Sequence, residues 1–269
     1  MMANRDQREV ELKLLLDGAA DHDRVRELLD GLVPAEVATQ DNLYLETTRL
    51  SLRAAGVMLR VRLSGAKAVL TVKGRATLVD GISRVDEFES DLEGESAAIW
   101  RPLGRVPRAA QILADGSLPA RLRRAGAADI NGDTTLHLLA AVRNTRRRYV
   151  VGLASFGLDA SSAGAPLSIE LDHTLYPGGD ERFEMEVEDP RVDHLRDGLC
   201  AWLDRMDISW RLADRSKYKQ LIDALDAPPT AAQSTGHGAG GVYTARGAYT
   251  AGGVRPGGLD DGRGGSVGE

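Results

Sequence analysis

The stretch EVELK, residues 9–13, decides the fold of this chain. Glu9, Glu11 and Lys13 stand at alternate positions, and apolar residues fill the positions between them. Successive side chains of a β-strand point to opposite faces of its sheet. The segment therefore predicts a strand, at about residues 8–16, with one charged face and one apolar face.

The same alternation recurs along the chain. It is present at Arg60 and Arg62, Lys73, Glu87 and Glu89, Arg146 and Arg148, Glu170 and Asp172, and Glu184, Glu186 and Glu188. A single strand of this kind is usually a half-exposed antiparallel strand whose polar face meets water. Here acidic and basic strands are interspersed, which favours a sheet curled around a charged lumen. A closed sheet would bring carboxylates and guanidinium groups into one cavity suited to a polyanion and its divalent metal ions.

The ordered set of segments resembles the CYTH superfamily, also called triphosphate tunnel metalloenzymes. EVELK is similar to the family's ExExK signature, which alone is a weak signal because acidic strands are common. Further similar segments follow in the family's order: DNLYLETTRLSLRAAGVMLRVR (41–62), LTVKG (70–74), EFE (87–89), TRRRY (145–149), IELD (169–172), FEMEVE (183–188) and SKY (216–218). Glu46 stands where the family usually has Asp. The resemblance covers about residues 8–222.

The resemblance implies an α+β fold, an eight-stranded antiparallel closed β-barrel with a charged lumen and helices packed outside. The period-two alternation agrees, because the apolar face of each strand must be covered. Further strands are expected at about 42–48, 57–64, 68–74, 83–92, 134–142, 143–153, 166–174 and 182–189. Helices are expected at 21–32, 191–206 and 214–226, with two or three short helices within 94–130.

Composition bounds the rest of the architecture. Residues 227–269 include thirteen glycines and almost no large apolar residue, which predicts a disordered tail after a tunnel domain at 1–226. The net charge of −6 argues against a general nucleic-acid surface. The lone Cys200 cannot form an intrachain disulfide. No apolar run resembles a signal peptide or a membrane span, so we expect a cytoplasmic monomer or homodimer without a membrane partner.

A triphosphate needs several cations along its length. Arg binds phosphate through a planar bidentate fork, and Lys acts as a compact point charge. The resemblance assigns five residues to triphosphate binding: Arg60, Arg62, Lys73, Arg146 and Lys217. Arg148 shares the charged face and joins this set, although the family's arginine lies three residues before the aromatic residue, which matches Arg146 and Tyr149.

The expected cofactor is Mg²⁺ or Mn²⁺, because these hard cations prefer carboxylate oxygens. The natural cage combines the first strand with a late one: Glu9, Glu11, Glu184 and Glu186. Glu188 is on the same face but nearer the strand end, where it is either a ligand or a rim carboxylate without a role. Four more carboxylates either bind metal or pair with the arginines: Glu87, Glu89, Glu170 and Asp172.

The resemblance implies metal-assisted hydrolysis of a triphosphate, with Glu9, Glu11, Lys13 and Lys73 as the catalytic group. Lys13 either stabilises charge on the leaving diphosphate or only pairs with the glutamates beside it. The aromatic content of 4% offers little to stack a thiazole or adenine ring, which favours inorganic triphosphate as substrate. The alternatives are a thiamine triphosphatase, a class IV adenylate cyclase, or a non-catalytic polyphosphate or nucleotide sensor. The five histidines show no metal-ligand spacing.

Overall fold

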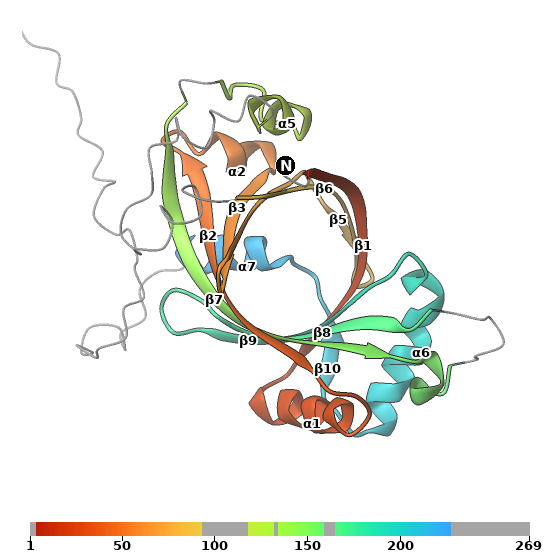
Figure 1. Cartoon of the computed structure of the whole chain (residues 1–269). Coiled ribbons are helices and arrows are strands. Elements are labelled where there is room, and N and C mark those ends of the chain that lie inside the picture. The colour runs from red at the N-terminus through yellow and green to blue at the C-terminus, as the bar shows by residue number, and fades with distance from the viewer. Residues whose placement is uncertain (1–3, 93–117, 132–133, 159–164, 227–269) are drawn as a thin grey trace, which may run out of the picture.

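The computed structural model describes residues 4–92, 118–131, 134–158 and 165–226. Figure 1 looks along an antiparallel β-barrel whose ring runs β1, β9, β8, β7, β2, β3, β4, β6 and back to β1. This closed ring of eight strands confirms the predicted fold. Its members are β1 (Asn4–Leu16), β2 (Glu36–Thr47), β3 (Met58–Ser64), β4 (Lys67–Lys73), β6 (Ile82–Asp91), β7 (Leu136–Val151), β8 (Leu167–Leu175) and β9 (Glu181–Glu188).

The strand at β7 differs from the sequence analysis. The two strands predicted at 134–142 and 143–153 form this one continuous strand, because no glycine or proline interrupts residues 136–151. A register shift between Tyr44 and Leu45 of β2 accommodates the long strand. Two short strands extend the sheet beyond the ring: β5 (Thr77–Val79) pairs with β6, and β10 (Trp210–Leu212) pairs with β1.

The strand register places the charged residues on the inner face of the barrel. Residues directly opposite one another on antiparallel strands share a face of the sheet. Lys13 lies opposite Glu186, and Lys73 lies opposite Glu87. The same parity continues around the ring, so the charged face of each strand lines the lumen.

The apolar faces point outward and are covered by helices, as predicted. On one side, α1 (Ala19–Asp30) and α6 (Val192–Arg205) cover the wall of β1, β8 and β9 (Figure 1). On the other side, α2 (Ser51–Ala55) and α5 (Leu118–Arg124) cover the wall of β2, β3, β4 and β6. The core between barrel and helices is therefore two layers, and the barrel's interior is polar except at the end covered by the last helix.

The last helix, α7 (Lys217–Asp226), has a different partner. Its Leu221 packs on four side chains from the inner faces of β2, β3 and β7: Tyr44, Met58, Ala140 and Val142. The helix therefore lies across one end of the barrel and is seen through the opening in Figure 1. This position carries Lys217 into the lumen.

The described residues limit two predictions. The tail at 227–269 and the first part of the helical stretch, 93–117, lie outside them, so those predictions stay predictions. Helix α5 falls within the expected stretch at 94–130. None of the helices that the structure describes is both long and apolar enough to cross a membrane.

Glu46, the departure from the family pattern, has a structural role. Its buried carboxylate accepts backbone hydrogen bonds from Thr47 at 2.7 Å, Leu52 at 3.0 Å and Arg53 at 2.7 Å. These N–H groups belong to the turn after β2 and the start of α2, where a helix has no partners of its own for its first N–H groups. The carboxylate thus fixes α2 against the barrel and does not reach the lumen cations.

We expect Glu46→Ala to lower the free energy of unfolding by about 2–4 kcal/mol, because three N–H groups lose a charged acceptor. Glu46→Gln keeps the size and one oxygen acceptor, so its loss should be about half as large. Urea unfolding at neutral pH measures both. An alanine variant as stable as the parent protein would contradict this role.

Candidate active site

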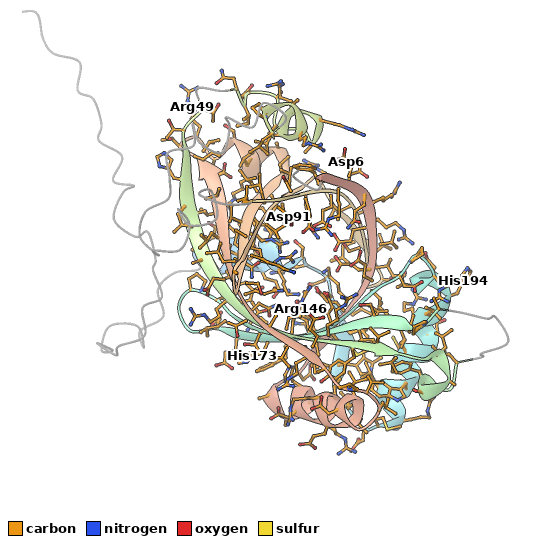
Figure 2. All side chains as sticks on the ribbon, viewed as in Figure 1. Asp6, Arg49, Asp91, Arg146, His173 and His194 are labelled. Atoms are coloured by element: carbon orange, nitrogen blue, oxygen red, sulfur yellow. The ribbon has the colours of Figure 1, made fainter. Side chains whose placement is uncertain are left out.

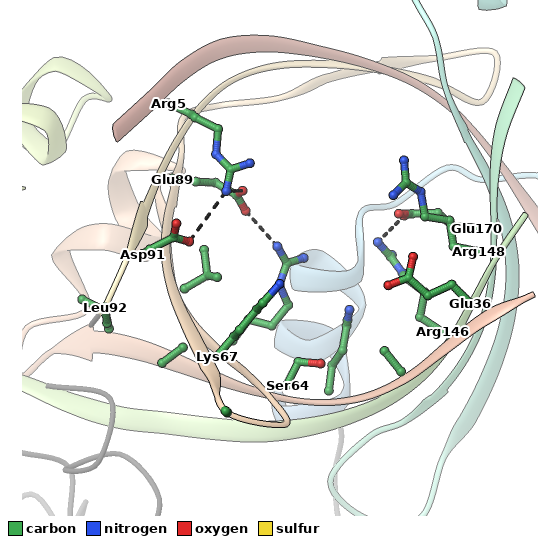
Figure 3. Close-up of a pocket in the computed structure, with 16 residues that line it drawn as sticks. Arg5, Glu36, Ser64, Lys67, Glu89, Asp91, Leu92, Arg146, Arg148 and Glu170 are labelled. Atoms are coloured by element: carbon green, nitrogen blue, oxygen red, sulfur yellow. Dashed lines mark hydrogen bonds and ion pairs between the residues drawn. The ribbon is translucent and has the colours of Figure 1, made fainter. Parts of the chain in front are cut away.

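The barrel encloses two connected spaces. The mouth chamber, of about 1130 Å³, lies at the end of the barrel away from α7 (Figure 3). The deep chamber, of about 250 Å³, reaches the start of α7. Both are lined by Arg62, Glu89, Arg146 and Glu170, so they form one continuous tunnel.

The ring order sets opposite charges against each other across this tunnel. Strand β9 is four places from β3 in the ring of eight, and β8 is four places from β4. Glu186 and Glu188 of β9 therefore face the wall that carries Arg60 and Arg62 of β3. The acidic and basic strands predicted from the sequence are thus brought together from opposite sides of the barrel.

Lys217 enters the lumen from α7 and binds three carboxylates. Its Nζ lies 2.9 Å from Asp172, 2.6 Å from Glu184 and 2.6 Å from Glu186. Burial alone would lower the pKa of Lys217, but these carboxylates outweigh burial and raise the pKa well above its ordinary value. The ammonium therefore stays charged and ties α7 to β8 and β9.

Lys13 and Arg146 extend this buried network. The Lys13 Nζ lies 2.8 Å from Glu11 and 2.5 Å from Glu186. Arg146 donates to both oxygens of Asp172, at 2.8 and 2.6 Å, and also pairs with Glu186 at 2.9 Å. Burial would raise the pKa of Asp172, but Arg146 and Lys217 hold it at about 2. Four carboxylates proposed as metal ligands are thus engaged by cations here: Glu11, Asp172, Glu184 and Glu186.

The wall of β4 and β6 has its own ion pairs. Lys73 pairs with Glu9 of β1, on the other side of the intervening strand β6, and with Glu87 of β6 itself at 3.3 Å. Arg62 donates to Glu89 at 3.0 Å. Glu87 thus pairs with a lysine and Glu89 with an arginine, and metal binding by either carboxylate stays a prediction.

Arg60 is differently placed. Within the described part of the chain it forms no ion pair, and its buried Nε has no hydrogen-bond partner. Only its Nη2 donates, to Thr71 at 3.3 Å. Burial and the nearby Arg60 lower the pKa of Arg62. Two half-buried arginines for which the described residues offer one carboxylate partner, Glu89, make this wall suited to an anion.

Glu188 is the acidic counterpart of Arg60. It lies opposite Glu11 in the register and pairs with no cation among the described residues. Glu188 as a whole is exposed, but partial desolvation of its carboxyl in the tunnel, with the carboxylates of Glu9 and Glu170 nearby, raises its pKa to about 7. In the sequence, Glu188 stands out as the third acidic residue of an alternating strand. That pattern placed it on the charged face but did not decide its role.

The carboxylates around Glu188 are the kind of ligands that a hard divalent cation prefers. Glu9, Glu11 and Glu188 come from adjacent strands, and the pKa of Glu11 is also raised by burial despite Lys13 beside it. In the described residues no three potential ligands form a preset metal site, because Glu9 and Glu11 point at Lys73 and Lys13. A cation here would replace those ammonium partners.

The remaining candidates are consistent with a site confined to the lumen. In Figure 2, Arg146 lies inside the ring, whereas His173 and His194 lie outside it. Arg148 lines the mouth chamber and donates a hydrogen bond to Ser168 at 3.1 Å.

The sequence analysis missed two neutral residues of the site. Gln7 donates to Glu87 and Gln220 donates to Glu184. Neither was found because a neutral side chain is not part of a charge pattern.

A closed barrel with an ionic tunnel defines a class of protein, and comparison identifies the family. Residues 7–208 match the CYTH domain model, and the chain belongs to the CYTH family. A search of curated proteins finds no match.

Several solved structures are similar to this chain. A proposed adenylyl cyclase from Hippeastrum, described as having a dominant triphosphatase activity, is 25% identical with a TM-score of 0.66 over 80% of this chain and 96% of that one. A protein from Bacillus halodurans is 19% identical (TM-score 0.49; 80% and 98% covered), and one from Pyrococcus horikoshii is 16% identical (TM-score 0.48; 80% and 99% covered).

We expect Asp172→Asn to lower the free energy of unfolding at pH 7 by about 2–5 kcal/mol, because Arg146 and Lys217 lose a shared buried partner. The folded pKa of about 2 is below the ordinary 3.8, so this stabilisation is complete above pH 3.8 and is lost as the pH falls through about 2. Urea unfolding from pH 7 downward measures it.

The matched control is Asp41→Asn, which removes the half-exposed partner of Arg143 on the outer wall. Its effect should stay below about 1 kcal/mol at every pH. A difference between Asp172→Asn and the parent protein that did not shrink in acid would show that the charge of Asp172 is not what stabilises the barrel.

Proposed function

We propose that this protein hydrolyses inorganic triphosphate to diphosphate and phosphate inside the tunnel, with Mg²⁺ or Mn²⁺. The observation that carries the proposal is that two charges on opposite sides of one lumen have no ion-pair partner among the described residues: Arg60 on β3, whose buried Nε also lacks a hydrogen bond, and Glu188 on β9. An anion and a cation that bind together satisfy both. The triphosphatase activity described for the similar Hippeastrum protein supports this reading.

In this proposal the basic wall holds the substrate. Arg60 offers its free Nε, and Arg62 exchanges Glu89 for a phosphate oxygen. Arg146, Arg148, Lys73 and Lys217 supply further charge along the chain of phosphates. Because a guanidinium binds two oxygens at once, the arginines also fix the direction of the substrate.

The metal belongs to Glu9, Glu11 and Glu188, with Glu186 beside them. When bound, a divalent cation neutralises phosphate charge and makes water a better nucleophile near neutral pH. Lys13, freed from Glu11, is then positioned to offset charge on the leaving diphosphate. Asp172, Glu184, Glu87 and Glu89 keep the role they have here, which is to hold the lysines and arginines in position.

The lining of the tunnel favours an inorganic substrate. None of the described residues that line the mouth chamber is aromatic. The deep chamber has Tyr44 and Tyr218, whose rings pack on each other with centroids 5.6 Å apart and belong to the cluster under α7. Thiamine triphosphatase and adenylate cyclase activities need a partner for the organic ring, so they are the second choice.

Phosphate release with tripolyphosphate, thiamine triphosphate and ATP, together with a cyclic AMP assay, tests the proposal. We expect tripolyphosphate to have the highest kcat/KM and turnover to stop when EDTA removes the metal. Preference for either organic substrate would replace the proposal with that activity. Tight tripolyphosphate binding without metal-dependent turnover would make the protein a sensor.

Glu188→Gln and Glu11→Gln each keep the side-chain shape but remove charge needed by the metal. We expect kcat to fall by about a hundredfold or more in both, with partial recovery at high Mn²⁺ if the carboxylate only sets affinity. Glu36→Gln, which changes a carboxylate of the mouth chamber outside this set, is the control and should keep kcat. An active Glu188→Gln enzyme with unchanged metal affinity would return Glu188 to the role of a rim residue.

Arg62→Ala should act on substrate binding. It removes a charged bidentate contact worth about 1.5–3 kcal/mol, which corresponds to about a ten- to a hundredfold increase in KM when binding precedes a slow chemical step. Arg62→Lys keeps the charge without the fork and should lie between the two. Steady-state kinetics with tripolyphosphate distinguishes this from a loss of kcat alone.

A further inference from the structure

Gln220 is a neutral side chain among the buried charges at the α7 end of the tunnel. It follows Lys217 by three residues, so the two side chains lie on the same face of α7. Both reach the carboxylate of Glu184 on β9. Gln220 Nε2 donates to Oε1 at 2.8 Å, and Lys217 Nζ lies 2.6 Å from Oε2. Each oxygen of this carboxylate therefore has its own partner from α7.

The orientation of the Gln220 amide follows from its two neighbours. An ionised carboxylate only accepts hydrogen bonds, so the NH₂ group must face Glu184. The amide oxygen then faces the buried Tyr176. The Tyr176 hydroxyl shares its hydrogen between this oxygen and the backbone oxygen of Lys217, each at 3.4 Å. The amide is thus held in position as a hydrogen-bond donor to Glu184.

Glu184 depends on both partners because it is almost completely buried, with 1% of the residue exposed. A buried carboxylate that loses its charged partner is strongly destabilised unless hydrogen bonds to it remain. In the proposed function, a phosphate oxygen that binds Lys217 competes with Glu184 for the ammonium. The free energy needed to separate Lys217 from Glu184 therefore contributes to the affinity for the substrate.

Gln220 lowers the free energy of that separation. Its hydrogen bond to Glu184 remains when Lys217 turns to a phosphate, so the carboxylate keeps one partner. An apolar side chain at this position would leave Lys217 as the sole partner of Glu184 among the described residues. A cation at this position would instead hold Glu184 more strongly and release Lys217 more easily.

Gln220 has this effect from outside the substrate's path. It lines neither chamber of the tunnel and borders a separate, open groove of about 410 Å³. A triphosphate bound in the tunnel therefore does not contact Gln220, and any influence on the substrate must pass through Glu184 and Lys217.

We propose that Gln220 is a positioning residue that sets how readily Lys217 passes from Glu184 to the substrate. The inference rests on the proposed triphosphate hydrolysis and adds to it a residue that adjusts substrate binding. Because Gln220 does not touch the reacting phosphate, it acts on KM and leaves kcat nearly unchanged.

The test compares Gln220→Met and Gln220→Lys with the parent protein in steady-state hydrolysis of tripolyphosphate with Mg²⁺. Methionine keeps the length of the side chain without a donor, and we expect KM to rise by about three- to tenfold. Lysine has room at the open groove, and we expect KM to fall by about two- to fivefold. In both variants kcat should stay within about twofold of the parent value. A residue that only stabilised α7 would make both variants worse, so a lysine variant whose KM is not lowered would overturn the inference.

Ala224→Lys is the charge-matched control. Ala224 lies one turn further along α7 on the same groove, so its substitution adds the same charge away from Glu184. We expect its KM to stay within about twofold of the parent value. A decrease as large as that of Gln220→Lys would overturn the inference, because a general charge effect would then explain both.

A double-mutant cycle tests whether Gln220 acts through Glu184. In a Glu184→Gln background there is no buried carboxylate for Gln220 to support, so Gln220→Met should change KM by less than about twofold. An undiminished effect in that background would overturn the inference.

The failure of the inference can be distinguished from the failure of the proposed function. Turnover with the same KM in the parent, Gln220→Met and Gln220→Lys proteins would overturn only the inference. If no triphosphate is hydrolysed, the proposed function fails, and calorimetric binding of tripolyphosphate tests the inference. Weaker binding by Gln220→Met together with tighter binding by Gln220→Lys would then support it. Any other order of affinities, or no binding by any of the three proteins, would overturn it.

Discussion

The pairing of β1 with β6 is the constraint on which the rest of this structure depends. It runs from Asn4 opposite Ser90 to Leu12 opposite Ile82 and joins the two edges of the sheet. Without it the charged faces would meet bulk water, as they do in most antiparallel sheets. With it, carboxylates, lysines and arginines are enclosed together, and each buried charge needs a partner of opposite sign. The ionic network of the lumen is the consequence of closure.

The alternation in the sequence was sufficient to predict which side chains face the lumen and which face outward. A strand has only two faces, so once Glu9, Glu11 and Lys13 share one, the leucines between them must share the other. Other features are set by tertiary contacts that no local pattern contains. The position of α7 across the barrel end depends on Tyr44 and Met58 from distant strands. The role of Glu46 depends on the path of the turn into α2.

The candidate site also has features that the sequence predicts and features that depend on tertiary contacts. The sequence predicted which residues face the lumen, but not how their charges pair. Asp172 and Glu184 are in a strand pattern equivalent to that of Glu188, yet Lys217 engages both and leaves Glu188 unpaired. The difference arises because α7 reaches only one end of the tunnel. The contacts of Lys217 on α7, and not the sequence motif, therefore separate Asp172 and Glu184 from Glu188.

The internal ion pairs have a consequence for the proposed reaction. A phosphate oxygen that takes Lys73 or Lys13 releases a carboxylate, Glu9 or Glu11, and that carboxylate then becomes a ligand for the metal. A metal that takes the carboxylate first frees the ammonium for phosphate. In the proposed reaction, binding of metal and binding of substrate are therefore coupled, and thermodynamic linkage requires each to raise the affinity of the other by the same factor. A weakly charged ligand gains little from this exchange, because it cannot compensate the broken ion pairs. In the proposed reaction the ion pairs of the tunnel thus favour ligands of high charge density.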